Sequence, residues 1–327
     1  MPLHITLLGL GRLGASLGLA LRAQDDLHLT GFDTDPEAAR AAQGRGLVHR
    51  SEWNLARAVE GADLVLLALP LSMQRDLLAA VAPSLRPDGI LASLAPLLGP
   101  PLAWAAELLP KRNHFVAGHP ILSPAQLLSD EVGLDAARAD LFARGLWALA
   151  PAPGCAPEAL RLVGDLAQAT GAAPYFVEPA EHDGWMGGAD SLPAILAWAL
   201  MRAGAASPGW NEMRKVADRA FATATAALAE TDPAALLLNR EAVLHYLDAA
   251  LAELGSLRER VAAGKGPALN ETLAEMADAR AMWLADRRRG DWEGLEKPKL
   301  EMPSAGESVS RLFLGGLLGR KREDKRE

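Results

Sequence analysis

The segment that most restricts the fold of this chain lies close to its start. An apolar run at residues 5–8 leads directly into GLGRLG at residues 9–14, and a helical stretch follows at residues 15–22. A buried strand, a GxGxxG turn and a helix in this order form the phosphate-binding corner of dinucleotide-binding βαβ units. The sequence therefore predicts a Rossmann-type, doubly wound α/β sheet that begins with this corner.

The residues of the GxGxxG turn have separate expected tasks. Gly9 permits the tight turn, Gly11 lets the backbone approach a pyrophosphate, and Gly14 lets the helix pack closely on the strand. The helix N-terminus adds free N–H groups and the positive end of its dipole. Arg12 is expected to contact the pyrophosphate or the adenine side of the cofactor, and Leu13 completes this set of predicted contacts.

An acidic residue at the end of the next apolar run indicates which dinucleotide is bound. Asp33 follows the run at residues 29–32. A carboxylate there accepts hydrogen bonds from the ribose hydroxyls and repels a 2′-phosphate, so NAD is favoured over NADP, although Arg12 leaves some NADP binding open. Leu69 ends the apolar run at residues 64–69, and it is expected at the cofactor together with Pro70.

Apolar runs of this kind alternate with helical stretches through about residue 178. They are near-continuous, as expected for strands that are buried on both faces of a sheet. Residues 1–179 are therefore predicted to form the dinucleotide-binding domain. The runs lie at residues 5–8, 27–32, 64–69, 90–91, 115–117, 146–149 and 175–177.

Beyond residue 180 the strand-like runs disappear and helix signals replace them. Asp232-Pro233 is typical of a helix start, and another helix is expected to begin at Asn270 and to end at Gly290. We predict an all-helical domain at residues 180–290 that forms a homodimer through its excess of apolar positions. Residues 291–327 are expected to be a linker and a tail that docks on its own domain, with a membrane-surface or partner-binding segment as the alternative.

The composition of the chain argues against several classes of protein. The formal net charge of −8 argues against a nucleic-acid partner, because phosphate binding favours a basic face. With one cysteine and no metal-type spacing among its seven histidines, the chain is expected to hold neither a disulfide nor a metal. The start does not look like a signal peptide and no long apolar stretch is free of charge, so we expect no membrane span and a cytoplasmic location.

Six segments give the chain a resemblance to the prephenate dehydrogenase family, the NAD(P)-dependent enzymes of tyrosine biosynthesis that include arogenate dehydrogenases. The likeness covers about residues 3–288. It implies a Rossmann-type domain, a helical homodimerisation domain, and hydride transfer with oxidative decarboxylation of a small molecule such as prephenate or arogenate. Many related dehydrogenases share GLGRLGASLGL, GFDTDP and ADLVLLALPLS, whereas FVAGHP (residues 115–120), EHD (181–183) and NRE (239–241) are the specific part.

The resemblance implies that His119, the histidine of the GHP segment, is catalytic. Its position agrees, because His119 follows a strand-like run and the carboxyl ends of strands face the ligand crevice in doubly wound sheets. A neutral imidazole there can accept the proton of a hydroxyl whose carbon loses hydride. Pro96 and Leu98 stand where the family usually has a serine and a lysine, and Ser93, one turn earlier, is the candidate replacement.

Two further departures fall on the substrate side. Residues 190–194 read DSLPA where the family often carries Ser-His-Leu-Pro-His, so both histidines are replaced. The family's arginine for a substrate carboxylate has no counterpart at residues 221–226, and Arg214 and Arg219 are the nearby candidates. Burying a dianionic substrate without such partners is costly.

These departures leave three functions open. The first is an NAD-dependent dehydrogenase of the prephenate dehydrogenase type, or a variant for a less anionic substrate. The second is a non-catalytic NAD-binding sensor or assembly module. The third is an imine or ketone reductase, which Asp33 disfavours because this class would use NADPH.

Overall fold

The computed structural model describes residues 2–129, 131–264 and 266–290. Backbone contacts divide the chain into two compact units, Met1–Val243 and Leu244–Glu327. This division falls within a long helix, whereas the sequence predicts a boundary at residue 179, which stays a prediction. The predicted linker and tail at residues 291–327 lie outside the described residues.

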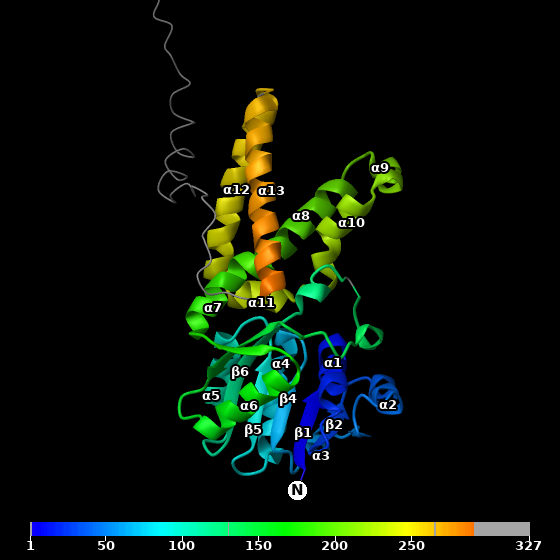
Figure 1. The fold of residues 1–327 in the computed structure, drawn as a ribbon, viewed down its shortest axis with the longest axis vertical. Coiled ribbons are helices and arrows are strands. Elements are labelled where there is room, and N and C mark those ends of the chain that lie inside the picture. The colour runs from blue at the N-terminus through cyan, green and yellow to red at the C-terminus, as the bar shows by residue number, and fades with distance from the viewer. Residues whose placement is uncertain (1, 130, 265, 291–327) are drawn as a thin grey trace, which may run out of the picture. The chain divides into compact units, whose positions relative to one another are not determined.

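Among the described residues, eight strands form one sheet in the first unit, in the order β3-β2-β1-β4-β5-β6-β7-β8 (Figure 1). Neighbouring strands are parallel except for β6 and β7, which are antiparallel. The order of the first six is that of the Rossmann fold, so the predicted doubly wound sheet is confirmed. The strands are β1 (Leu3–Leu8), β2 (Leu27–Phe32), β3 (Arg50–Ser51), β4 (Leu64–Leu67), β5 (Ile90–Leu94), β6 (His114–Ile121), β7 (Leu146–Pro151) and β8 (Ala173–Phe176).

Helices bury apolar side chains on both faces of this sheet. The first face packs against α1 (Arg12–Leu21), α2 (Pro36–Gly44) and α6 (Pro157–Ala169). The second face packs against α3 (Leu55–Val59), α4 (Leu71–Val81) and α5 (Gly99–Leu108). Successive residues of β5 divide between the two cores, because side chains alternate along a strand.

The far edge of the sheet differs from the sequence-based expectation. The apolar run at residues 175–177 predicts a strand that is buried on both faces, but Tyr175 and Phe176 of β8 are 42% and 58% exposed. This prediction is wrong because β8 is an edge strand with β7 as its strand neighbour. The two-residue β3 contains no apolar run, so no sequence pattern predicts it.

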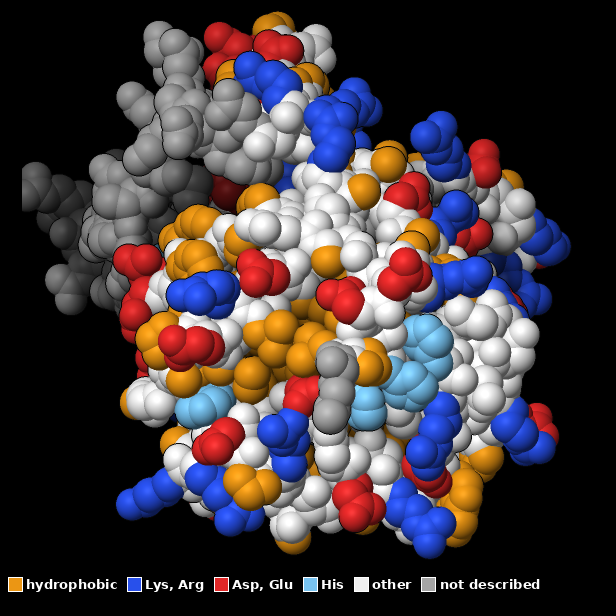
Figure 2. Space-filling model, turned by 60° about the horizontal axis from the view of Figure 1, so that its bottom comes forward, with side chains coloured by type: hydrophobic (Ala, Val, Ile, Leu, Met, Phe, Trp, Pro, Cys, Tyr) orange, Lys and Arg blue, Asp and Glu red, His pale blue; other side chains and the backbone are white. Residues whose placement is uncertain are grey.

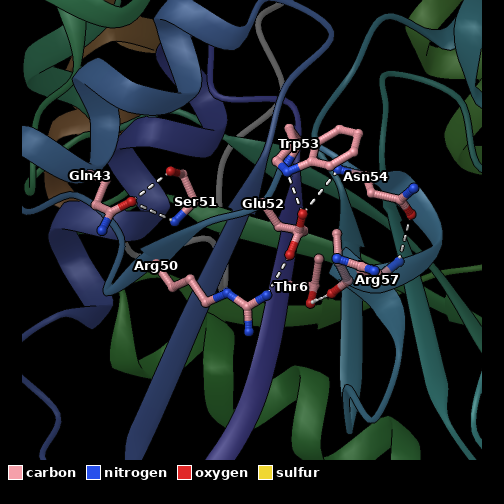
Figure 3. Close-up of polar contacts among 9 residues, drawn as sticks. Thr6, Gln43, Arg50, Ser51, Glu52, Trp53, Asn54 and Arg57 are labelled. Atoms are coloured by element: carbon pink, nitrogen blue, oxygen red, sulfur yellow. Dashed lines mark hydrogen bonds and ion pairs between the residues drawn. The ribbon is translucent and has the colours of Figure 1, made fainter.

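A polar network fixes the corner between β3 and α3, next to the end of β2 (Figure 3). The buried carboxylate of Glu52 accepts the N–H groups of Trp53 and Asn54 at 3.0 and 3.1 Å and pairs with Arg50. The backbone hydrogen bond from Asn54 is the main cause that lowers the pKa of Glu52. Asn54 in turn caps α3 by accepting the N–H of Arg57. The loop beside the predicted cofactor corner is therefore held by side chains.

Helices replace strands after β8, as predicted. In the first unit these are α7 (Pro179–Met186), a π-helical turn (Gly187–Ser191), α8 (Leu192–Ala205), α9 (Trp210–Val216), α10 (Arg219–Thr225) and α11 (Pro233–Leu238). The helix α12 (Arg240–Ala262) crosses into the second unit, which also contains α13 (Gly266–Arg289). Short 3-10 turns lie at Ala82–Ser84, Pro124–Gln126, Leu134–Ala136 and Ala226–Ala229.

The predicted helix ends are confirmed at two positions and wrong at a third. Asp232 caps α11 by accepting the N–H of Ala234, and Gly290 follows the last residue of α13 with a φ of +68°. The expected start at Asn270 is wrong, because α13 already begins at Gly266. Pro267 falls in the first turn of that helix, where its missing N–H removes no intrahelical bond. Within the described residues, no helix combines the length and the apolar character that a bilayer crossing needs.

Candidate active site

The predicted GxGxxG corner lies between β1 and α1 and has the geometry that such a motif requires. Gly9 has a φ of +95°, and a Cβ there would lie 2.4 Å from the carbonyl oxygen of Ala68. A Cβ on Gly14 would lie 1.9 Å from the carbonyl oxygen of Gly9, whereas a Cβ on Gly11 would meet nothing within 4 Å. Packing therefore requires the outer two glycines, and Gly11 leaves open space before the free N–H groups of α1.

Asp33 is attached directly to this corner. Its Oδ2 accepts the N–H of Leu10 at 2.8 Å, and its Oδ1 accepts the N–H of Asp35 at 2.9 Å. Each oxygen keeps a second lone pair, so the carboxylate can still accept a ribose hydroxyl. The end of β2 therefore holds a fixed negative charge beside the glycine turn.

The other predicted cofactor residues surround the turn in different ways. Leu69 contacts it, because its Cγ lies 2.9 Å from the position of a Cβ on Gly9. Leu13 and Leu69 are half-buried and Pro70 is exposed. Arg12 differs from all of them, since its side chain is only 9% exposed and its Nη1 lies 3.8 Å from Oε1 of Glu230.

His119 lies in β6, just beyond the level at which β5 ends, since Leu94 of β5 pairs with Gly118. Its Nδ1 is 3.0 Å from Nε2 of His182 in α7. Nδ1 of His182 is in turn 3.0 Å from Oδ1 of Asp183. We call this hydrogen-bonded series of Asp183, His182 and His119 the histidine relay.

Asp183 anchors the relay to two other segments. Its Oδ1 and Oδ2 accept the N–H groups of Leu98 and Gly99 at 2.8 and 2.9 Å, at the N-terminus of α5. A carboxylate is stabilised at this position by the helix dipole. The backbone carbonyl of Asp183 accepts Nδ2 of Asn239 at 2.6 Å. Two segments that the sequence analysis treats only as family markers, EHD and NRE, thus meet behind His119.

The surroundings of His119 keep its imidazole neutral. Burial, followed by the charge that His182 would carry, lowers the pKa of His119 to about 3. His119 as a whole residue is half-buried. A neutral imidazole near pH 7 is the form that can accept a proton.

Ser93 lies on the same face of the sheet as His119 but is enclosed. It pairs with Ala117 of β6, two residues before His119. Its side chain has no exposed surface, and its Oγ has no hydrogen-bond partner among the described residues. Leu98 is also fully buried, and Ala194 is 7% exposed, so these two of the positions that depart from the family pattern are apolar packing positions here.

Three other histidines gather away from this site. Each pair of neighbouring rings in the series His4, His28 and His49 has a centroid separation of 5.3 Å. They lie at the amino ends of β1 and β2 and before β3, and histidine side chains gather on this face in Figure 2. Position relative to the strand ends therefore separates His119 from these three.

Comparisons with known proteins agree with the fold and the motifs. Residues 17–175 match the family model described as the nucleotide-binding domain of prephenate dehydrogenase. The cyclohexadienyl dehydrogenase of Zymomonas mobilis is 27% identical over 291 residues, which cover 86% of this chain and 97% of that protein. The prephenate dehydrogenase of Bacillus subtilis is 27% identical over 266 residues, covering 79% of this chain and 70% of that protein.

Solved structures extend the likeness to the fold. The prephenate dehydrogenase of Aquifex aeolicus, in complex with hydroxyphenyl propionate and NAD+, superposes with a TM-score of 0.73 at 22% identity, covering 86% of this chain and 98% of that one. The arogenate dehydrogenase of Synechocystis gives 0.66 at 23% identity, covering 86% and 100%. The family model and the two relatives therefore make this chain similar to prephenate and cyclohexadienyl dehydrogenases, and the solved structures share its fold.

Proposed function

We propose that the chain is an NAD-dependent dehydrogenase that oxidises the ring hydroxyl of a cyclohexadienol acid, such as prephenate or arogenate, with loss of carbon dioxide. The observation that carries this proposal is the histidine relay, which ends in the imidazole of His119, in β6 just beyond the carboxyl end of β5. The names of the similar proteins support the choice of reaction.

The relay determines which nitrogen of His119 acts as the base. A carboxylate only accepts hydrogen bonds, so Nδ1 of His182 carries the proton that faces Asp183. Nε2 of a neutral His182 is then an acceptor, and Nδ1 of His119 must be the donor between the two rings. Nε2 of His119 is left with a free lone pair.

In the proposed reaction Nε2 of His119 accepts the proton of the ring hydroxyl while hydride leaves the same carbon. A bound NAD would supply the hydride acceptor. The C–C bond to the ring carboxylate then breaks, carbon dioxide leaves, and the electron pair completes the aromatic ring. The resulting phenolate takes the proton back from His119, whose positive charge is stabilised meanwhile through His182 by Asp183.

The choice of NAD over NADP is part of the proposal. The corner fits a dinucleotide, because the space beside Gly11 is open and the first N–H groups of α1 face it. Asp33, held by the N–H groups of Leu10 and Asp35, would meet a 2′-phosphate with a fixed negative charge. We expect NAD to raise the melting temperature more than NADP does at equal concentration. Equal shifts would remove Asp33 from this role.

A homodimer formed through the helical part is also proposed. Large apolar side chains are exposed along α12 and α13, including Leu251, Leu273 and Trp283 at 50% or more. Exposed apolar surface of this extent is typical of an interaction surface. Sedimentation at several concentrations should give a dimer, and a monomer that persists on concentration would contradict it.

The decisive experiment measures reduction of NAD by the purified protein with prephenate or arogenate. Turnover with either substrate, and its loss in His119→Asn, is the expected result. Tight NAD binding without turnover would instead favour a non-catalytic NAD-binding module, which the replaced positions Pro96 and Ala194 would explain. Ser93 is enclosed, so a direct contact between Ser93 and the substrate is not part of the proposal.

A further inference from the structure

The guanidinium of Arg12 is buried and has no hydrogen-bond partner among the residues that the structure describes. The side chain is 9% exposed, and within those residues neither Nε nor Nη2 is hydrogen-bonded. Its ion pair with Glu230 is loose, because Nη1 and Oε1 are 3.8 Å apart and the Glu230 side chain is 62% exposed. Burying a cation with unsatisfied donors is costly, so this site is built to receive an acceptor that carries negative charge.

The electrostatics of the surroundings agree with an anionic ligand. Arg12 begins α1, where the N-terminal end of the helix dipole adds positive potential. The helices that follow β8 in the first unit also carry arginines, but these are exposed; examples are Arg202, Arg214 and Arg219. Of the arginines that the structure describes in that unit, Arg12 is the one whose side chain is buried. Among these arginines, Arg12 is therefore the one that has already lost its hydration before a ligand binds.

The direction of the Arg12 side chain distinguishes between two possible ligands, the pyrophosphate of the cofactor and a carboxylate of the substrate. A pyrophosphate at the glycine turn is met by backbone N–H groups and needs no side chain. The Arg12 guanidinium instead lies beside Glu230, which follows the 3-10 turn Ala226–Ala229 of the helical segment. Desolvation and then the charge of Glu230 raise the pKa of Asp190, so Glu230 lies close to the π-helical turn as well. The guanidinium thus faces the helices that follow β8.

We propose that Arg12 is the residue that binds a carboxylate of the substrate, in place of an arginine from the helical segment. The inference rests on the proposed function, because it concerns the acid that this function oxidises. The Glu230 carboxylate marks the direction from which a ligand carboxylate reaches Nε and Nη2. Such a bond is charge-assisted and can be bidentate, which a guanidinium favours. It also explains how the chain can dispense with an arginine at residues 221–226.

The test compares an acid with its neutral amide in the NAD-saturated, full-length protein. Calorimetry measures the binding of hydroxyphenyl propionate and of the corresponding propionamide to the unchanged protein, to Arg12→Leu and to the control Arg202→Leu at the exposed end of α8. We expect Arg12→Leu to weaken acid binding by about 10- to 100-fold, the loss of one charge-assisted contact. Amide binding and NAD affinity should change less than about threefold, and Arg202→Leu should behave like the unchanged protein.

Several outcomes would overturn the inference. A loss of NAD affinity in Arg12→Leu with an unchanged acid-to-amide ratio would assign Arg12 to the pyrophosphate. Equal binding of acid and amide by the unchanged protein would exclude a carboxylate site. Should Arg12→Leu fail to fold, Glu230→Gln replaces it: removing the competing carboxylate should tighten acid binding severalfold, and no change would count against the site. Because none of these measurements needs turnover, they remain informative if the proposed reaction is not observed.

Discussion

The glycine corner and the histidine relay both lie at carboxyl ends of strands, but they are built from different materials. The corner is a contiguous turn, whose ligand-facing groups are backbone N–H and a space free of side chains. The relay consists of side chains, and its two histidines are 63 residues apart in sequence. We therefore expect the corner to be disturbed by substitutions that add side-chain atoms, and the relay by substitutions that remove hydrogen-bonding groups.

The largest expected effect comes from removing the end of the relay. His119→Asn keeps a similar size and one hydrogen-bonding group but removes the base. Turnover should fall by about 100-fold or more while the dissociation constant of NAD changes little. Steady-state kinetics and NAD titration provide the check, with His4→Asn at the amino end of β1 as the matched control. Near-normal turnover would make His119 structural.

A pair of glycine substitutions tests the corner in the opposite way. Gly14→Ala places a methyl group against the carbonyl oxygen of Gly9, so we expect a loss of about 1–3 kcal/mol in the free energy of unfolding. Gly11→Ala meets no protein atom and has an ordinary φ of −66°, so it should fold normally and lose NAD affinity instead. Denaturant unfolding and NAD titration separate the two effects. Unchanged NAD affinity in Gly11→Ala would mean that the open space at Gly11 has no role in binding.

Two replacements of His182 determine whether the middle of the relay positions His119. His182→Gln can still accept Nδ1–H of His119 through its amide oxygen, whereas His182→Leu leaves that donor unpaired. We expect about a tenfold lower kcat for the leucine variant, with KM nearly unchanged, and a partial recovery for glutamine. The kcat and KM values and their pH profiles are the readout. If both variants lose activity equally, hydrogen bonding to His119 is not what His182 contributes.

The smallest expected effect is a change in the pH dependence of stability. The pKa of His119 is about 3 in the folded chain and near 6.5 when unfolded. Between these values the unfolded chain binds the extra proton, so this residue makes the fold less stable as pH falls from about 6.5 towards 3. His119→Asn removes this proton uptake. The melting temperature of the variant should therefore fall less between pH 6.5 and 4.5 than that of the unchanged protein. Parallel curves for the two proteins would show that burial of the ring does not govern its protonation.

Sequence reasoning reaches much further in one region than in the other. The Rossmann order of strands, the glycine turn and Asp33 follow from local patterns, because a strand, a turn and a helix adjacent in sequence are also adjacent in space. The contact of His119 with His182 depends on where α7 packs, which no local period encodes. The burial of Arg12 has the same origin, since its partner Glu230 comes from a distant turn. The resemblance identifies the EHD and NRE segments, but only the fold shows that Asp183 and Asn239 in these segments are hydrogen-bonded to each other behind His119.

Asp183 carries several duties at once, and this has an evolutionary consequence. The side-chain carboxylate of Asp183 caps the N-terminus of α5 and orients His182. The backbone carbonyl of the same residue accepts a hydrogen bond from the side chain of Asn239. A change at Asp183 would therefore disturb a helix, a base and a junction between segments in a single step. No hydrogen bond of this kind involves the side chains of Pro96 and Ala194, so we expect substitutions at these two positions to disturb the relay less. We expect descendants of this chain to diversify around the relay while Asp183 itself stays unchanged.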